Sequence, residues 1–360
     1  MLPWLVGPLA PSTELRIRDA AGPVAFRLLD WETVHLGERL GRLWSGLVGD
    51  DRLGASDAAT LRAYFARGAP RDRLRSTAEV AMEHAVADTY RQAGLDRSAP
   101  LLADRVFPPV LVALTPPPNV LVTAPRTELR VLQSVVLNAM DTAAQERLED
   151  SADSTGVSSL VAPIGGLATY PSMVLEEDAA DRVLSSVAHE WLHQYLVFYP
   201  LGTGYWSNQE TREINETTAD MVGQEIGGQL AAGLDLNRPE PPAASSTGQP
   251  AAAPFDFRAF MRETRLQTEQ LLAAGQVEAA EAYMRARQAE LRQHGYIIRK
   301  LNQAYFALYG SYGGGFAASP ANPIPDLLRQ LRERSGSLGE FVIRMRSITT
   351  VEQLRSAAQA

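Results

Sequence analysis

The chain of 360 residues contains no cysteine. Disulfide bonds, thiolate metal sites and thiol nucleophiles are therefore excluded for any fold that the chain adopts. Histidine is also scarce, with five residues in the whole chain. Two histidines at the spacing of metal ligands would therefore stand out against this background.

Positive charge is in the minority. The 34 Lys and Arg residues against 42 Asp and Glu residues give a formal net charge of −8. A nucleic-acid-binding protein usually carries a basic surface, so no nucleic-acid partner is expected. The content of 45% hydrophobic and 21% charged residues is ordinary for a globular protein. A chain of this length can form one large domain or two moderate ones, and its composition indicates no particular oligomeric state.

The apolar N-terminal segment is too short to be a membrane-spanning helix. Residues 1–10 are apolar, but a membrane-spanning helix needs about 20 such residues. The segment also lacks the basic region of a signal peptide. We expect an apolar arm that packs on the protein, which would be cytoplasmic as written. A membrane tether or export is expected only if a further apolar segment lies upstream.

Two of the five histidines fall in one motif, His189-Glu190-Trp-Leu-His193. On a helix, positions i and i+4 lie on one face, so both imidazoles can bind one metal ion. Glu190 is placed to accept a proton from a metal-activated water molecule. The alternative is a helix with two surface histidines. Residues 181–198 are apolar on most sides, which favours a buried helix and hence a bound metal, because unsatisfied imidazoles are costly in a core.

A second segment, Asn215-Glu216-Thr-Thr-Ala-Asp220, supplies carboxylates. Glu216 completes a set of two histidines and one glutamate, the ligand type of open catalytic zinc sites. The expected cofactor is therefore Zn²⁺, although ligand type alone would also suit another divalent metal.

Together the two segments resemble those of the gluzincin metallopeptidases, the thermolysin-like clan. The resemblance implies that His189, His193 and Glu216 bind zinc and that Glu190 is the general base. It also implies that Asp220 accepts a hydrogen bond from a ligand histidine, for which we expect His189. Twenty-two residues separate His193 from Glu216, slightly more than is usual in the clan. The match covers roughly forty residues, so it predicts a zincin-like core and says little about the rest.

The predicted fold class is α+β and predominantly helical, with a small mixed sheet. The β-rich runs 107–115 and 120–124 are expected to form a hairpin, and a helix is expected over 128–148. Four regions are predicted in chain order: an N-terminal helical region at 1–100, the catalytic core at 101–235, a flexible linker at 236–256 and a C-terminal helical subdomain at 257–360.

A strand-like segment at 157–170 precedes the metal helix and is interrupted by two glycines. In gluzincins the strand in this order forms the sheet edge beside the zinc, and a substrate backbone pairs with it. The residues expected to bind substrate are Gly165, Gly166, Leu167 and Ala168. The alternative for this segment is a plain glycine bulge or turn.

The clan usually uses a C-terminal histidine or tyrosine to stabilise the tetrahedral oxyanion. Tyr309 is the preferred candidate because it adjoins Gly310, where a side chain could face a cleft. The other candidates are His294, Tyr296, Tyr305 and Tyr312. Aromatic packing between helices is the alternative for all of them.

The predicted function is therefore zinc-dependent hydrolysis of a peptide or protein substrate. Two alternatives remain: a zinc aminopeptidase or amidase, and a non-catalytic scaffold that the metal stabilises and whose helical C-terminus binds a partner. The segment Gly165–Thr169 contains no glutamate to bind a free amino terminus, which favours an endopeptidase over an aminopeptidase.

Overall fold

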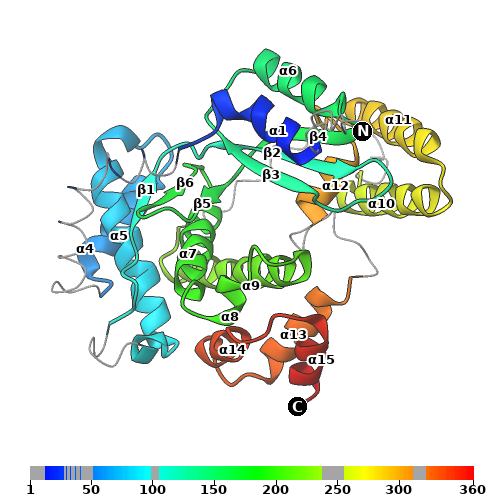
Figure 1. The fold of residues 1–360 in the computed structure, drawn as a ribbon. Coiled ribbons are helices and arrows are strands. Elements are labelled where there is room, and N and C mark those ends of the chain that lie inside the picture. The colour runs from blue at the N-terminus through cyan, green and yellow to red at the C-terminus, as the bar shows by residue number, and fades with distance from the viewer. Residues whose placement is uncertain are drawn as a thin grey trace, which may run out of the picture. The chain divides into compact units, whose positions relative to one another are not determined.

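The computed structural model describes residues 13–27, 52–98, 105–236, 255–310 and 322–360, with positions 30, 33, 37 and 41. The chain forms two compact units, each made of three segments that are separate in the sequence (Figure 1). Unit 1 comprises residues 1–26, 118–164 and 257–310, and unit 2 comprises residues 27–117, 165–256 and 311–360.

Unit 1 contains a three-stranded antiparallel sheet in the order β3-β2-β4. Its elements are α1 (Thr13–Ala21), η1 (Gly22–Val24), β2 (Asn119–Pro125), β3 (Gln133–Leu137), α6 (Thr142–Asp153), β4 (Val157–Pro163), α10 (Phe257–Ala273), α11 (Val277–Gln293) and α12 (Gln303–Gly310). Leu121 of the central strand pairs with Val135 on one side and Val161 on the other. Ile17 of α1 and Leu148 of α6 bury their side chains in the same hydrophobic cluster as Leu121. Burial of these side chains holds the two helices on the sheet.

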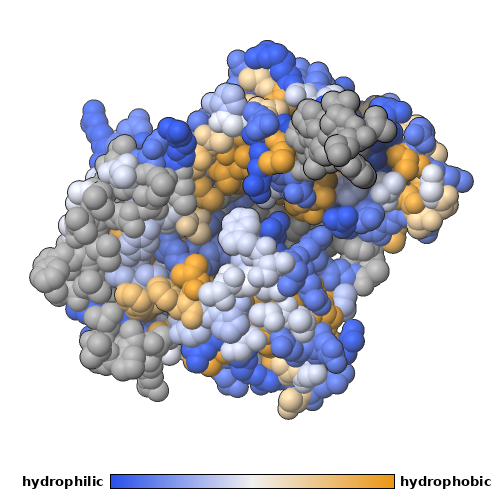
Figure 2. Space-filling view, in the orientation of Figure 1, coloured by the Kyte–Doolittle hydropathy of each residue, from blue (hydrophilic) through white to orange (hydrophobic). Residues whose placement is uncertain are grey.

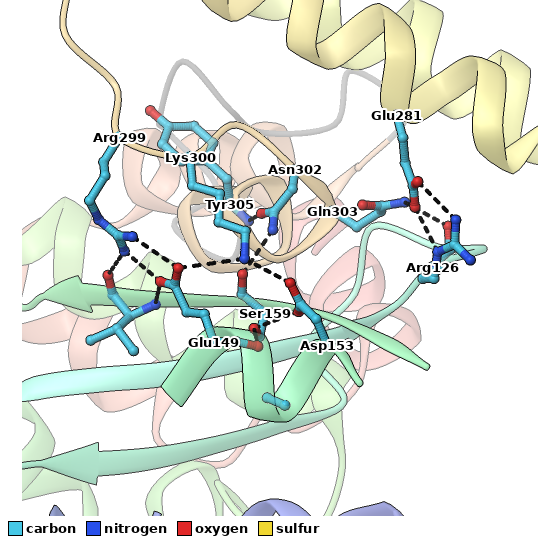
Figure 3. A network of polar contacts seen from close by, with 12 residues as sticks. Arg126, Glu149, Asp153, Ser159, Glu281, Arg299, Lys300, Asn302, Gln303 and Tyr305 are labelled. Atoms are coloured by element: carbon cyan, nitrogen blue, oxygen red, sulfur yellow. Dashed lines mark hydrogen bonds and ion pairs between the residues drawn. The ribbon is translucent and has the colours of Figure 1, made fainter. Parts of the chain in front are cut away.

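A buried carboxylate joins three elements of unit 1 (Figure 3). Glu149 of α6 is 2% exposed and accepts a hydrogen bond from the Val161 N–H of β4 at 2.6 Å. Arg299, which precedes α12, donates to both carboxylate oxygens of Glu149 and to the Val161 carbonyl. The neighbouring Lys300 donates to Asp153 at 2.9 Å. The segment before α12 is therefore bound to α6 and β4 by charge-assisted hydrogen bonds.

Unit 2 is mostly helical and carries a second small sheet in the order β1-β6-β5. Its elements are α4 (Ala55–Tyr64), α5 (Arg71–Gln92), η2 (Leu95–Ser98), β1 (Val112–Leu114), β5 (Gly166–Leu167), β6 (Ser172–Val174), α7 (Ala180–Leu196), α8 (Pro200–Thr203), α9 (Gln209–Gly233), α13 (Ile324–Arg334), α14 (Leu338–Met345) and α15 (Val351–Gln359). β1 runs parallel to β6, and β5 is antiparallel to β6.

One hydrophobic cluster extends through the helices and the sheet of unit 2. Trp191 of α7 lies in this cluster, packs against the ring of Tyr90 of α5 and donates its indole N–H to the Pro108 carbonyl at 2.7 Å. Figure 2 shows a hydrophobic patch beside the place where Figure 1 puts α7. Large exposed side chains that follow α7 in the sequence are Val197, Phe198 and Trp206.

α5 lies in the helical region predicted at 1–100, and α10 and α11 lie in the one predicted at 257–360. α7 carries the first motif and α9 the second. The strand-like segment 157–170 forms β4 and β5, with a break at Gly165. No helix of the described residues has both the length and the hydrophobicity to cross a membrane. Most of the linker predicted at 236–256 lies outside the described residues.

Two predictions of secondary structure were wrong, one of a hairpin and one of a helix. The runs around β1 and β2 do not form a hairpin, because β1 pairs with β6 whereas β2 pairs with β3 and β4. Three prolines, Pro116 to Pro118, connect the two strands, and proline cannot adopt the positive φ of a tight hairpin turn. The helix expected over 128–148 begins at Thr142, since residues 133–137 pair with β2 instead. Pairing with a neighbouring strand overrides local helical spacing here.

We expect Glu149→Gln to lower the free energy of unfolding by about 2–4 kcal/mol, because it leaves the guanidinium of Arg299 without its counter-charge. Urea unfolding at pH 7 measures this change. Asp150→Asn, at an exposed position of the same helix, is the matched control and should change the stability by less than about 0.5 kcal/mol. Equal midpoints for the two variants would contradict a stabilising role of the buried carboxylate.

The same contribution should depend on pH. Burial raises the pKa of Glu149, but the bonds from Arg299 and the Val161 N–H and the charge of Lys300 outweigh it, so the net pKa is below its usual 4.5. The stabilisation is therefore present above pH 4.5 and is lost as the pH falls through the lowered pKa of the folded state. The difference between wild type and Glu149→Gln should shrink over that range, and a difference that grows on acidification would contradict the assignment.

Candidate metal centre

Two helices of unit 2 bring the three predicted ligands together. His189 and His193 lie one turn apart on α7, and Glu216 faces them from α9. The two Nε2 atoms are 2.9 Å apart, and each lies 3.6 Å from Oε2 of Glu216. Ligand atoms bound tetrahedrally to one zinc ion lie about 3.3 Å from one another. The group could therefore hold a metal ion with small adjustments of the side chains.

Glycines on α9 allow the two helices to approach closely. A Cβ atom at Gly223 would lie 2.6 Å from the Ser185 carbonyl and 3.1 Å from Cβ of His189. One turn later, a Cβ atom at Gly227 would lie 2.5 Å from the Asp181 carbonyl. Any larger residue at these positions would separate α9 from α7 and move Glu216 away from the histidines.

Hydrogen bonds fix the protonation of both imidazoles. The Asn215 amide donates to the Leu201 carbonyl at 3.0 Å, so its oxygen faces Nδ1 of His193 at 2.8 Å. Nδ1 of His189 lies 3.3 Å from the Asp220 carboxylate. Each Nδ1 can therefore donate a proton to its oxygen partner, which leaves Nε2 as the ring nitrogen that can bind a metal. Asp220 occupies the position predicted for it, whereas the role of Asn215 was not foreseen.

Two Nε2 lone pairs and a carboxylate oxygen consequently point at one place. Acceptor lone pairs at these distances repel one another unless a cation lies between them. Burial lowers the pKa of His189, but the carboxylates of Asp220, Glu216 and Glu190 outweigh it and the net pKa is raised. Burial raises the pKa of Glu216, but the two histidines outweigh it and lower the net pKa. All of these shifts express an attraction for positive charge at the centre of the cluster.

Tyr205 is a member of the cluster that the sequence motifs did not reveal. Its hydroxyl donates a hydrogen bond to Oε1 of Glu216, the oxygen that faces away from the histidines. Its ring contacts the His193 ring edge to face, with 6.1 Å between centroids. Tyr205 lies in the connection between α8 and α9, where no periodic pattern marks a functional residue.

Glu190 lies beside the cluster and against the strand β5. Its side chain is 7% exposed, and burial raises its pKa above the usual value. A Cβ atom at Gly166 of β5 would lie 2.2 Å from Oε1 of Glu190, so any larger residue there would displace the Glu190 side chain. Among the described residues, β5 pairs with β6 alone and is the edge of its sheet. Leu167 lies in this edge strand, with Gly165 and Ala168 exposed on either side of it.

The described candidates for oxyanion stabilisation belong to unit 1. Tyr309 belongs to α12 of unit 1, where its ring lies 4.6 Å from that of Tyr305. Burial raises the pKa of both hydroxyls. His294 and Tyr296 also belong to unit 1, and Tyr312 lies outside the described residues. A catalytic role for Tyr309 stays a prediction.

No family model, curated protein or solved structure matches this chain. The interpretation of the cluster therefore depends on its geometry and on the chemistry of its residues.

We expect the purified protein to bind about one zinc ion per chain, because three ligand atoms converge in a preorganised site. His193→Ala and Glu216→Ala should each lose the metal, as measured by elemental analysis after dialysis. His84→Ala removes a histidine that is paired with Asp57 in the same unit and serves as the control, which should keep the metal. Metal retained by Glu216→Ala would contradict the assignment of the third ligand.

The close approach of the two helices is tested by one pair of glycines. Gly223→Ala places a methyl group against the Ser185 carbonyl, so we expect a loss of about 1–3 kcal/mol in stability and weaker zinc binding. Gly228→Ala, on the exposed side of α9 with nothing within 4 Å, should instead stabilise the helix by up to about 1 kcal/mol. Thermal unfolding and zinc titration of the two variants would show no difference if helix spacing does not control the site.

Proposed function

We propose that the protein is a zinc-dependent metallopeptidase that hydrolyses peptide bonds. The observation that carries this proposal is the number of protein ligands in the cluster. Structural zinc sites are usually closed by four protein ligands, whereas catalytic sites have three and leave a position open. The group His189, His193 and Glu216 offers three ligand atoms among the described residues.

Glu190 lies beside the three ligands and can act as a general base. When bound, zinc supplies Lewis acidity to a water molecule and to the carbonyl of the substrate. Glu190 accepts the proton of the attacking water and then delivers it to the leaving amine. Burial raises the pKa of Glu190, which brings it closer to neutrality and suits both steps. Tyr205 offers a phenol hydroxyl at the cluster, and Tyr309 stays the candidate from sequence for stabilising the oxyanion.

The edge strand supports a peptide as the substrate. An extended peptide can add to a sheet edge through main-chain hydrogen bonds, whatever its side chains are. β5 is such an edge, and its Gly166 lies against Glu190. A peptide that pairs with β5 would therefore pass close to the general base. The segment from Gly165 to Thr169 contains no carboxylate for a free amino terminus, which favours an endopeptidase or carboxypeptidase over an aminopeptidase.

We expect Glu190→Gln to reduce peptide hydrolysis by at least about 10²-fold, because the amide cannot accept the proton of the attacking water. Its zinc content should equal that of the wild type, since Glu190 is not one of the three ligands. A library of internally quenched fluorescent peptides measures the hydrolysis. A Glu190→Gln protein with full activity would refute the assignment of the base.

A chelator provides the complementary control. Removal of zinc should abolish the hydrolysis, and added zinc should restore it. A protein that melts at a lower temperature without zinc but hydrolyses no peptide of the library would instead support the metal-stabilised scaffold.

A further inference from the structure

Arg212 holds a positive charge next to the metal cluster. It lies on α9 four residues before Glu216, so both side chains emerge from the same face of the helix. Its guanidinium carbon lies 5.3 Å from the centroid of the Tyr205 ring and 5.2 Å from that of Trp206. Tyr205 in turn bonds Glu216. The aromatic rings therefore hold the cation beside the third metal ligand.

This cation has no counter-charge among the residues that the structure describes. The nearby acids on α9 are engaged elsewhere: Glu210 accepts the Val351 N–H at 2.7 Å, and Glu213 accepts a hydrogen bond from Asn322. Nε of Arg212 is buried and has no hydrogen-bond partner in the described part of the chain. Buried guanidinium donors are normally satisfied, so an unpaired one beside a reactive site indicates a partner that arrives with a ligand.

The spacing limits where such a partner can lie on a bound peptide. Four residues at a rise of about 1.5 Å each separate Arg212 from Glu216 by about 6 Å along α9. An extended peptide advances about 3.3–3.6 Å per residue. A group that reaches Arg212 therefore lies one or two residues from the peptide bond at the metal.

We propose that Arg212 binds a carboxylate of the substrate, within two residues of the bond that is hydrolysed. This inference rests on the proposed peptidase function. The guanidinium matches a carboxylate by two parallel hydrogen bonds, and its contacts with the Tyr205 and Trp206 rings restrain its position. The carboxylate belongs either to the C-terminus of a peptide or to an Asp or Glu side chain. Trp206, whose side chain is 76% exposed, offers an apolar surface to the same segment of the peptide.

The test measures binding in the Glu190→Gln protein loaded with zinc, so that no peptide is consumed. Three fluorescein-labelled pentapeptides are compared by anisotropy: one with a free C-terminus, one amidated, and one amidated with a glutamate at the penultimate position. We expect at least one of the two carboxylate-bearing peptides to bind about tenfold more tightly than the amidated neutral peptide. Preference for the free terminus would identify a carboxypeptidase-like substrate, and preference for the internal glutamate would identify an acidic side chain.

Arg212→Gln, made in the same protein, should abolish this preference and leave the zinc content unchanged. Arg212→Lys should keep part of it, because the charge remains without the planar fork. Arg73→Gln, at an exposed position of α5 in the same unit, is the matched control and should keep all of it. If the guanidinium only holds the two aromatic rings in place, Arg212→Gln would lower the affinity for all three peptides equally. Equal affinities in the Glu190→Gln protein, or a preference that survives Arg212→Gln, would overturn the proposal.

Failure of this inference is distinguishable from failure of the proposed function. Carboxylate-dependent binding by a zinc protein that hydrolyses no peptide would refute the peptidase and keep the role of Arg212. Hydrolysis by the wild type without any preference for carboxylates would keep the peptidase and refute the role of Arg212.

Discussion

The constraint on which unit 2 depends is the convergence of two imidazole lone pairs and a carboxylate on one point. Nε2 of His189 and Nε2 of His193 are 2.9 Å apart, and their Nδ1 atoms are already committed to acceptors. Such an arrangement is unfavourable in a buried place unless a cation occupies it. The surrounding structure therefore has to supply the energy and the rigidity that keep the acceptors together when the cation is absent.

The rigidity comes from residues that contact the ligand side chains and the helices that carry them. Gly223 lets α9 lie against the backbone of α7, and the helices bury a continuous hydrophobic cluster on their other faces. The Leu201 carbonyl, in α8 just after α7, accepts a hydrogen bond from the Asn215 amide and so orients it. The chain that leaves α7 thus returns to orient a ligand on that same helix. Preorganisation of this kind lowers the reorganisation needed for metal binding.

The sequence predicted what depends on local spacing and missed what depends on tertiary contact. The ligand group could be read from two short segments because i and i+4 positions share a helix face. Tyr205 could not, since it reaches Glu216 only through the path of the chain between α8 and α9. Strand pairing failed for the same reason: the partner of β1 is β6, about sixty residues away, and helical spacing over 133–137 concealed β3. Sequence marked Gly166 as a substrate-binding residue or part of a glycine turn, whereas its closeness to Glu190 is a tertiary contact that no sequence pattern shows.

The two substrate contacts proposed for the site, pairing with β5 and an ion pair with Arg212, recognise different parts of a peptide. Pairing with β5 would use backbone hydrogen bonds, which every peptide offers, so it contributes affinity without selecting a side chain. A carboxylate at Arg212 would be read by charge, and like charges or neutral amides at that place would leave the guanidinium unpaired. A site that combines them tolerates many sequences along the edge strand and discriminates at one position. Since Arg212 contacts the Tyr205 ring and Tyr205 bonds Glu216, an occupied guanidinium would also hold the third ligand in place, which couples substrate selection to the metal.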